Sequence, residues 1–156
     1  MQIRKADLND ISQLKELYYN TITTINVFDY NAEQIAAWAS TADRTDSLAN
    51  RIESQYFYIC ETTEGIITGF SSLEEDGYLD LMYVHKDYQR QGIATLLLNA
   101  IIIKATELNL TGLTTEASIT AKSFFIKNGF EVTEEQKVFI NYIGLTNYKM
   151  RFNFKS

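Results

Sequence analysis

Residues 81–95 read LMYVHKDYQRQGIAT, and this stretch decides which fold the rest of the chain can form. Its first four residues are an apolar run typical of a buried strand, and its last five open an apolar helical pattern. A further strand is expected at residues 113–116, after Gly112. Because a strand, a helix and a second strand in this order form a parallel crossover, the sequence predicts a βαβ unit across residues 80–116.

The segments before this unit predict an antiparallel meander. Residues 56–60 are dense in β-formers, residues 69–73 form a second strand candidate, and residues 78–84 return after the polar turn at 74–77. Parallel and antiparallel pairing in one sheet predicts a mixed α/β fold with helices on both faces.

The two ends of the chain complete this pattern. Asn9 is expected to cap an amphipathic helix, Asn31 and Gln34 form a capping box at the start of a helix over residues 32–39, and Gly129 is expected to end a helix over residues 119–128. The helix of the crossover is expected to bury Ile93, Leu96, Leu97, Ala100, Ile101 and Leu108. Further elements are expected at residues 2–5 (strand), 47–54 (helix), and 132, 138–143 and 148–154 (strands).

The composition narrows the class of protein. A chain of 156 residues predicts one domain, residues 1–156, and the net charge of −6 disfavours nucleic acid as the partner. One cysteine, Cys60, and one histidine, His85, argue against a metal site. The longest apolar stretch, residues 93–103, is too short to span a bilayer, so no membrane association is expected and a cytoplasmic location is the default.

The start of the helix at residue 93 carries the chemistry. The first N–H groups of a helix have no partner within it and lie at the positive end of the helix dipole. Gly92 and the small Ala94 let an anion approach this backbone closely, so a diphosphate is the expected ligand. The alternative is a tight turn that needs glycine only for its geometry.

Two segments resemble the signatures of the GNAT acetyltransferase superfamily. Residues 88–94, YQRQGIA, follow a hydrophobic strand and resemble the pattern Gln/Arg-x-x-Gly-x-Gly/Ala, and residues 121–130, AKSFFIKNGF, resemble the second signature, a helix that ends in Gly-Phe. Residues 31–38, 77–81 and 115–118 look like the YafP-like branch of this superfamily. The resemblance spans nearly the whole chain.

The resemblance implies a fold, a ligand and a set of binding residues. The fold is a mostly antiparallel sheet whose central parallel strand pair is splayed to hold CoA, and the acyl donor is acetyl-CoA, with no metal. Backbone groups of Met82, Tyr83 and Val84 would hold the pantetheine arm as an added strand, and one N–H would stabilise the oxyanion. The cofactor-binding set further contains Gln89, Arg90, Gln91, Gly92, Ile93, Ala94, Thr95, Ser118, Phe124, Phe125 and Lys127.

Two positions depart from the superfamily pattern. Ser118 stands where Asn often contacts the coenzyme, and Phe125 stands where a Tyr commonly protonates the leaving thiolate. Because Phe125 cannot donate a proton, either another tyrosine replaces it or solvent protonates the thiolate. Tyr142 and Tyr148 are the candidates for a replacement acid.

Asp80 is the candidate general base. By the two-residue period of a strand it shares a face with Tyr78, Met82 and Val84, and partial burial is expected to raise the pKa of its carboxyl. The alternative is an Asp that bonds a neighbouring loop and only shapes the pocket. Glu116, at the end of the next strand, is expected to bind a cationic substrate or share the base role, or else to cap a helix.

The expected reaction is transfer of an acetyl group to an amine of a small molecule or peptide, by direct attack in a ternary complex. Trp38 lies in the segment that lines the acceptor site in this superfamily, which indicates a flat acceptor or a core tryptophan. The competing hypothesis is a non-catalytic acyl-CoA sensor. A monomer and a homodimer are both compatible with the sequence.

Overall fold

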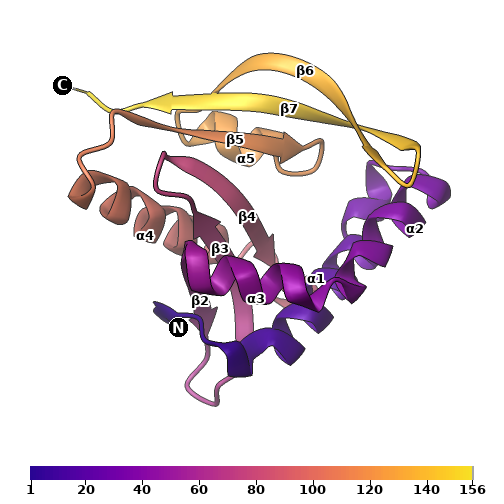
Figure 1. Ribbon diagram of the computed structural model, residues 1–156, viewed down its shortest axis with the longest axis horizontal. Helices are drawn as coiled ribbons and strands as arrows, with labels where there is room; N and C mark the ends of the chain where they lie inside the picture. Colours follow the sequence, from indigo (N-terminus) through magenta and orange to yellow (C-terminus); the bar gives the residue numbers. More distant parts are fainter. Residues whose placement is uncertain (156) are drawn as a thin grey trace.

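The computed structural model describes residues 1–155 of the chain, which form a seven-stranded sheet with helices on both faces (Figure 1). The strands are β1 (Gln2–Lys5), β2 (Tyr56–Glu61), β3 (Ile67–Leu73), β4 (Tyr78–Val84), β5 (Gly112–Ser118), β6 (Glu131–Ile140) and β7 (Ile143–Asn153). The α-helices are α1 (Ile11–Thr24), α2 (Ala32–Ser40), α3 (Thr45–Ser54), α4 (Ile93–Glu107) and α5 (Lys122–Lys127). Short 3-10 helices are η1 (Leu8–Asp10), η2 (Asn26–Phe28), η3 (Thr41–Asp43) and η4 (Lys86–Tyr88).

The strand order in the sheet is β1-β2-β3-β4-β5-β7-β6. The pair β4 and β5 is parallel, and the other neighbouring pairs are antiparallel. This arrangement confirms the predicted mixed α/β fold with a central parallel pair.

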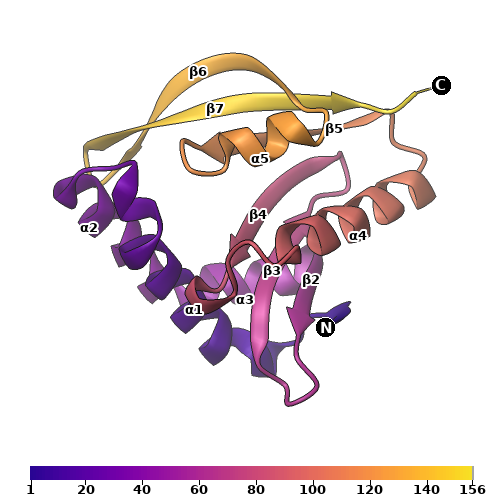
Figure 2. The same cartoon turned by 180° about the vertical axis from the view of Figure 1, so that it is seen from behind.

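The helices divide between the two faces of the sheet, as the opposite views of the molecule show (Figure 2). On one face, Leu14 and Leu17 of α1 and Leu48 of α3 pack with Phe57 and Phe70 of the sheet. On the other face, α4 and α5 cover a second buried cluster: Leu73, Leu79, Leu98, Ile101, Ala105, Leu113, Ala117, Phe125, Phe130 and Met150. Because that cluster draws residues from both sides of the β4–β5 seam, it holds the two halves of the sheet together.

The parallel pair is short, and this creates the cleft. Only Tyr78↔Thr114 and Leu79↔Thr115 are in register between β4 and β5. Beyond them β4 pairs with β3 and β5 pairs with β7, so the carboxyl ends of the two central strands separate. This is the end of the crossover strand where open sheets bind their ligands.

Several local predictions are confirmed and others are wrong. Asn31 and Gln34 do form a reciprocal capping box at the start of α2, and Gly129, with φ 92°, follows α5. The N-terminal cap, however, is Asp7 rather than Asn9, because a turn of 3-10 helix precedes α1. Asp7 accepts the N–H of Asn9 at 2.8 Å.

The buried face of α4 and the bounds of α5 and β6 also differ from the predictions. In α4, Leu96 is 41% exposed whereas Leu98 is buried. Because the helix is apolar on almost every side, its sequence does not show which side faces the sheet. Residues 119–121 precede α5 rather than opening it, and β6 is one long strand with an irregularity between Val132 and Glu134.

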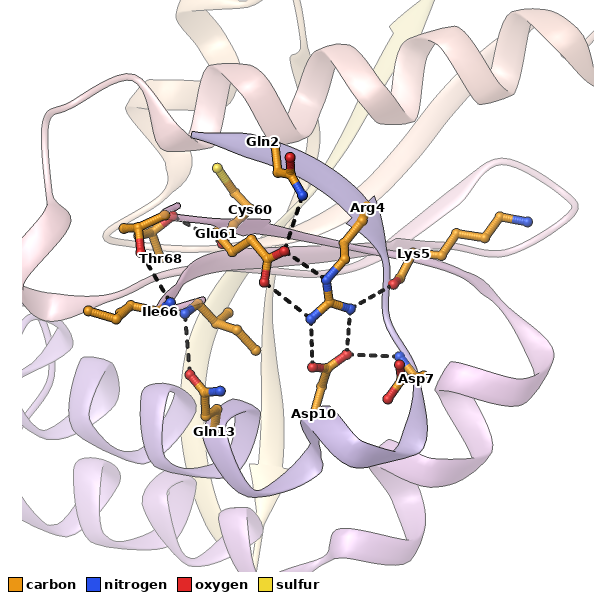
Figure 3. Close-up of polar contacts among 12 residues, drawn as sticks. Gln2, Arg4, Lys5, Asp7, Asp10, Gln13, Cys60, Glu61, Ile66 and Thr68 are labelled. Atoms are coloured by element: carbon orange, nitrogen blue, oxygen red, sulfur yellow. Dashed lines mark hydrogen bonds and ion pairs between the residues drawn. The ribbon is translucent and has the colours of Figure 1, made fainter. Parts of the chain in front are cut away.

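A charged network fixes the N-terminal strand (Figure 3). Arg4 of β1 donates to both carboxylate oxygens of Asp10, at 2.9 Å each, and to Glu61 of β2 at 3.0 and 3.2 Å. The hydrogen bonds of Arg4 hold the pKa of the Asp10 carboxyl below its usual range. Within residues 1–155, no helix is both long and apolar enough to cross a membrane.

Candidate functional site

A cavity of about 770 Å³ opens where β4 and β5 separate. Its wall combines the end of β4, the loop into α4, the end of β5 and the segment before α2. Most of the residues predicted for the site line it: Asp80, Met82, Tyr83, Val84, Gln89, Arg90, Gly92, Ile93, Ala94, Thr95, Glu116, Ser118, Phe124 and Phe125.

Four predicted residues lie elsewhere. Gln91 and Lys127 are exposed and do not line the cavity. Tyr142 lies in the β6–β7 turn with its side chain 99% exposed, so the structure does not bring it to the site as an acid. Tyr148 packs under Lys122, whose Nζ is 4.2 Å from the ring centroid, and it too lies off the cavity.

The loop before α4 presents main-chain N–H groups to the cavity. Gly92 has φ 81° and Arg90 has φ 60°, the left-handed region, and the first helical hydrogen bond runs from Leu96 N–H to the Gly92 carbonyl at 3.1 Å. The N–H groups of Ile93, Ala94 and Thr95 therefore precede the helical ladder. Since no atom lies within 4 Å of a Cβ built on Gly92, that position requires glycine for its φ rather than for space.

The end of β4 offers a second row of backbone groups. His85 N–H donates to the Thr68 carbonyl of the β3 side at 2.8 Å. Because alternate residues of a strand bond the same neighbour, Tyr83 also directs its main-chain groups toward β3, and Met82 and Val84 direct theirs toward the cleft. The Val84 carbonyl is already occupied by the hydroxyl of Thr21 at 2.9 Å. The cleft-facing groups thus belong to Met82 and Val84 rather than to Tyr83.

Asp80 lies on a different face of the sheet from the one predicted. Ser72 pairs with Leu81 and Leu73 pairs with Leu79, so Asp80 is the extra residue of a bulge. The bulge breaks the two-residue period: Met82 packs on the α4 side, whereas Asp80 faces α3.

The carboxylate of Asp80 is held by residues of α3 and its C-terminal cap. Its Oδ2 accepts from Arg51 Nε at 2.6 Å and from Gln55 Nε2 at 2.9 Å. The side chain of Asp80 is only 14% exposed. A partly buried carboxylate of this kind requires such partners, and here they lie outside the strand and are not visible in its sequence.

Glu116 of β5 lines the same cavity and is held by neutral donors. Tyr78 Oη donates to Glu116 Oε2 at 3.0 Å, and Gln136 Nε2 donates to Oε1 at 2.8 Å. Burial first, and then the charge of Glu116, raise the pKa of the Tyr78 hydroxyl above its ordinary value, so Tyr78 remains a donor. Glu116 does not cap α5: the Ser118 hydroxyl instead accepts the Ala121 N–H at 3.1 Å.

Aromatic side chains form the wall toward α2. Trp38 meets Tyr30 edge-on with ring centroids 5.4 Å apart, and Tyr83 with centroids 6.5 Å apart. Burial raises the pKa of the Tyr83 hydroxyl well above its usual value. The Tyr30 hydroxyl donates to the Thr146 carbonyl at 2.8 Å and so links the segment before α2 to β7.

Sequence reasoning did not find the partners of the two carboxylates, Arg51 for Asp80, and Tyr78 and Gln136 for Glu116, nor did it find Asn147 of the cavity wall. Each partner lies at least 20 positions from the carboxylate that it contacts, so no local pattern in the sequence brings the two together. Among residues 1–155, no cluster of three or more His, Cys, Asp or Glu side chains could hold a metal ion.

Comparison with known proteins identifies the class. Residues 26–152 match the model of the acetyltransferase (GNAT) domain. The chain is 32% identical over 152 residues to the uncharacterized N-acetyltransferase YafP of Escherichia coli (strain K12), covering 97% of this chain and 95% of YafP. The chain therefore belongs to the GNAT acetyltransferase family.

Two solved structures agree with this assignment. A GCN5-related N-acetyltransferase from Rhodopseudomonas palustris superposes with a TM-score of 0.93 at 31% identity, covering 98% of this chain and 95% of that one. The PaiA N-acetyltransferase of Thermoplasma acidophilum, solved in complex with coenzyme A, has a TM-score of 0.80 at 19% identity, with 98% of each chain covered.

Proposed function

We propose that the protein transfers an acetyl group from acetyl-CoA to an amine of a small molecule or peptide. The observation that carries this proposal is that the loop and first turn of α4, with their free N–H groups, and a carboxylate, Glu116, line one cavity. In support, relatives of the family are N-acetyltransferases, and PaiA was solved with coenzyme A.

The acetyl-CoA would lie along the open edge of β4. The pyrophosphate would bind the N–H groups at the start of α4, where the helix dipole favours negative charge. The pantetheine amides would pair with the cleft-facing N–H and carbonyl of Met82 and with the N–H of Val84, as an added strand does, because the Val84 carbonyl already accepts from Thr21 and Gln89. The adjacent N–H of β4 would then lie near the thioester oxygen and stabilise the oxyanion.

The amine would attack the thioester directly. Its nitrogen forms the new C–N bond, the carbon–sulfur bond breaks, and CoA leaves as a thiolate. We propose that Glu116 accepts the ammonium proton, because Tyr78 and Gln136 fix both of its oxygens and neither carries a compensating charge. Asp80, which was predicted to be the base, is instead proposed to hold Arg51.

Protonation of the thiolate is assigned to solvent. Phe125, 3% exposed, packs against Phe130 in the core, and neither Tyr142 nor Tyr148 lines the cavity. The thiolate of CoA is a tolerable leaving group without an acid, so the absence of the usual tyrosine is compatible with turnover.

Two variants test the assignment of the base by release of free CoA thiol across a range of pH. Glu116→Gln is expected to lower kcat by roughly 10²-fold or more and to remove the acidic limb of the pH profile. Asp80→Asn is expected to keep that limb and mainly raise KM for the acceptor. The reverse pattern would return the base role to Asp80, and tight acetyl-CoA binding without thiol release from any amine would favour a sensor.

A further inference from the structure

Arg51 is a charged side chain of the cavity to which the proposed reaction assigns no contact with the substrate. It lies on α3 and lines the cavity beside Tyr78 and Asp80. Its Nε is bonded to Asp80 and its Nη1 donates to Ser47 Oγ at 2.6 Å. Within the part of the chain that the structure describes, its Nη2 has no hydrogen-bond partner.

The arginine of the N-terminal network shows what a purely structural arginine looks like in the same protein. Every nitrogen of Arg4 is bonded: Nε to Glu61, Nη1 to Asp10 and the Lys5 carbonyl, and Nη2 to Asp10 and Glu61 (Figure 3). Arg51 is fixed by two hydrogen bonds of 2.6 Å, to Asp80 and Ser47, and its Nη2 has no partner within residues 1–155. An arginine held in this way is ready to bind a planar anion.

The position of Arg51 restricts what that anion belongs to. Two basic side chains line the described part of the cavity, and the other, Arg90, belongs to the loop before α4. Arg51 is bonded to Asp80 on the α3 side of the sheet, whereas Arg90 belongs to the loop that carries the proposed pyrophosphate site. Arg51 is therefore assigned to the acceptor rather than to the pyrophosphate.

A second unpartnered group lines the same cavity. The Oδ1 of Asn147, on β7 beside Ser118, is buried without a hydrogen-bond partner and its residue lines the cavity. With Glu116 it offers oxygen acceptors to an ammonium. The cavity thus contains oxygen acceptors for an ammonium, and Arg51 is a donor for an anion.

We propose that the acceptor is an amine that also carries a carboxylate, as in an amino acid, with Arg51 binding the carboxylate and the aromatic wall binding an apolar side chain. Asp80 is then a positioning residue that aims Arg51. The proposal rests on the proposed function and adds the class of substrate.

A matched set of acceptors tests the proposal in the thiol-release assay. Phenylalanine, its amide and phenethylamine share the amine and the ring and differ in the carboxylate. Wild-type protein is expected to use phenylalanine with a kcat/KM at least about tenfold above that of the other two compounds. Those two lack the carboxylate and so cannot form the charge-assisted contact with the Arg51 guanidinium. Equal or higher kcat/KM for phenethylamine would overturn the proposal.

Variants of Arg51 localise the effect. Arg51→Met is expected to bring the ratio of kcat/KM for phenylalanine to that for phenethylamine close to one, and Arg51→Lys to retain part of it. Arg44→Met, which removes an exposed arginine that does not line the cavity, is the matched control and should keep the wild-type ratio. A ratio unchanged in Arg51→Lys and Arg51→Met alike would also overturn the proposal.

A binding measurement separates this proposal from the proposed function. N-acetylphenylalanine and N-acetylphenethylamine are titrated calorimetrically into CoA-saturated wild-type protein, and the carboxylate compound is expected to bind at least about tenfold more tightly. If no amine releases thiol but this preference is present, the catalytic proposal fails and the anion site stands. Equal binding of the two compounds contradicts the anion site regardless of turnover.

Discussion

Two arginines and two carboxylates of this protein differ in their roles, and the difference follows from their hydrogen-bond partners. Arg4 and Arg51 both pair with a carboxylate, but Arg4 is fully bonded and joins three segments, whereas Arg51 lines the cavity and, within residues 1–155, its Nη2 has no hydrogen-bond partner. Asp80 and Glu116 are likewise both carboxylates of the cavity, and only Asp80 has a cationic partner. The sequence shows the residue types but not these pairings.

The Arg4 network makes a prediction about stability against pH. Arg4→Ala is expected to lower the free energy of unfolding at pH 7 by roughly 1–2 kcal/mol, through loss of charge-assisted hydrogen bonds in a part-exposed network. Because Arg4 lowers the pKa of Asp10 and Glu61, the stabilisation is present above their unfolded-state pKa values and is lost as the pH falls through the folded ones.

Urea denaturation at pH 7 and at pH 3 measures this effect. The difference in the free energy of unfolding between wild type and Arg4→Ala should be smaller at pH 3 than at pH 7. Lys5→Ala, which removes an exposed charge from the same strand, serves as the control and should change little at either pH. A difference of equal size at both pH values would show that packing, rather than charge, makes the contribution of Arg4.

At the scale of elements, the contact between α4 and β3 fixes the position of the N–H groups at the start of α4. Gly69 of β3 lies directly under the first turns of α4: a Cβ built there would meet Ile93 Cγ2 at 2.7 Å, and both Leu97 Cδ1 and the Tyr83 carbonyl at 3.0 Å. The contact therefore joins the backbone of the sheet to the helix whose N–H groups line the cavity.

Gly69→Val is expected to push the start of α4 away from the sheet. It should destabilise the fold by about 1–3 kcal/mol, as overpacking does, and weaken CoA binding beyond what the loss of stability explains. Thermal unfolding and CoA titration of the same sample measure both. Gly65→Asn, at an open loop position with φ 85° that Asn tolerates, is the control. Wild-type affinity in a folded Gly69→Val would contradict the role given to this contact.

Some features of the elements can be predicted from local sequence, and others cannot. The order of the elements, the bounds of β4 and the loop into α4 follow from local signals, namely apolar runs, turn residues and caps, and these predictions were correct. The bulge at Asp80 and the exposure of Leu96 depend on how one strand pairs and on how one helix is rotated against the sheet. Both result from long-range packing, which no local pattern specifies.

At the scale of the whole molecule, the sheet is two half-sheets joined by a short seam. One continuous apolar cluster spans both halves, and the hydrogen bond of Tyr30 links the segment before α2 to β7. The cleft between the carboxyl ends of β4 and β5 is therefore held open by packing on both sides. A ligand that enters it meets a preformed site, so little of its binding free energy is spent on rearrangement.

The preformed cleft also explains how an acidic protein can bind an anion. The net charge is −6, yet the start of α4 presents neutral main-chain N–H groups, whose dipoles do not enter that sum. Arg90 adds a cation to the same wall. Local geometry, rather than overall charge, determines which ligand is bound.

Calorimetric titration of the purified protein with CoA, and with pantetheine in parallel, tests this claim most directly. Pantetheine keeps the arm that would pair with β4 but lacks the pyrophosphate. CoA is expected to bind with one site per chain, and pantetheine at least about tenfold more weakly, because pantetheine cannot form the charge-assisted hydrogen bonds at the start of α4. No heat from CoA at millimolar concentration, or equal affinity for the two compounds, would contradict it.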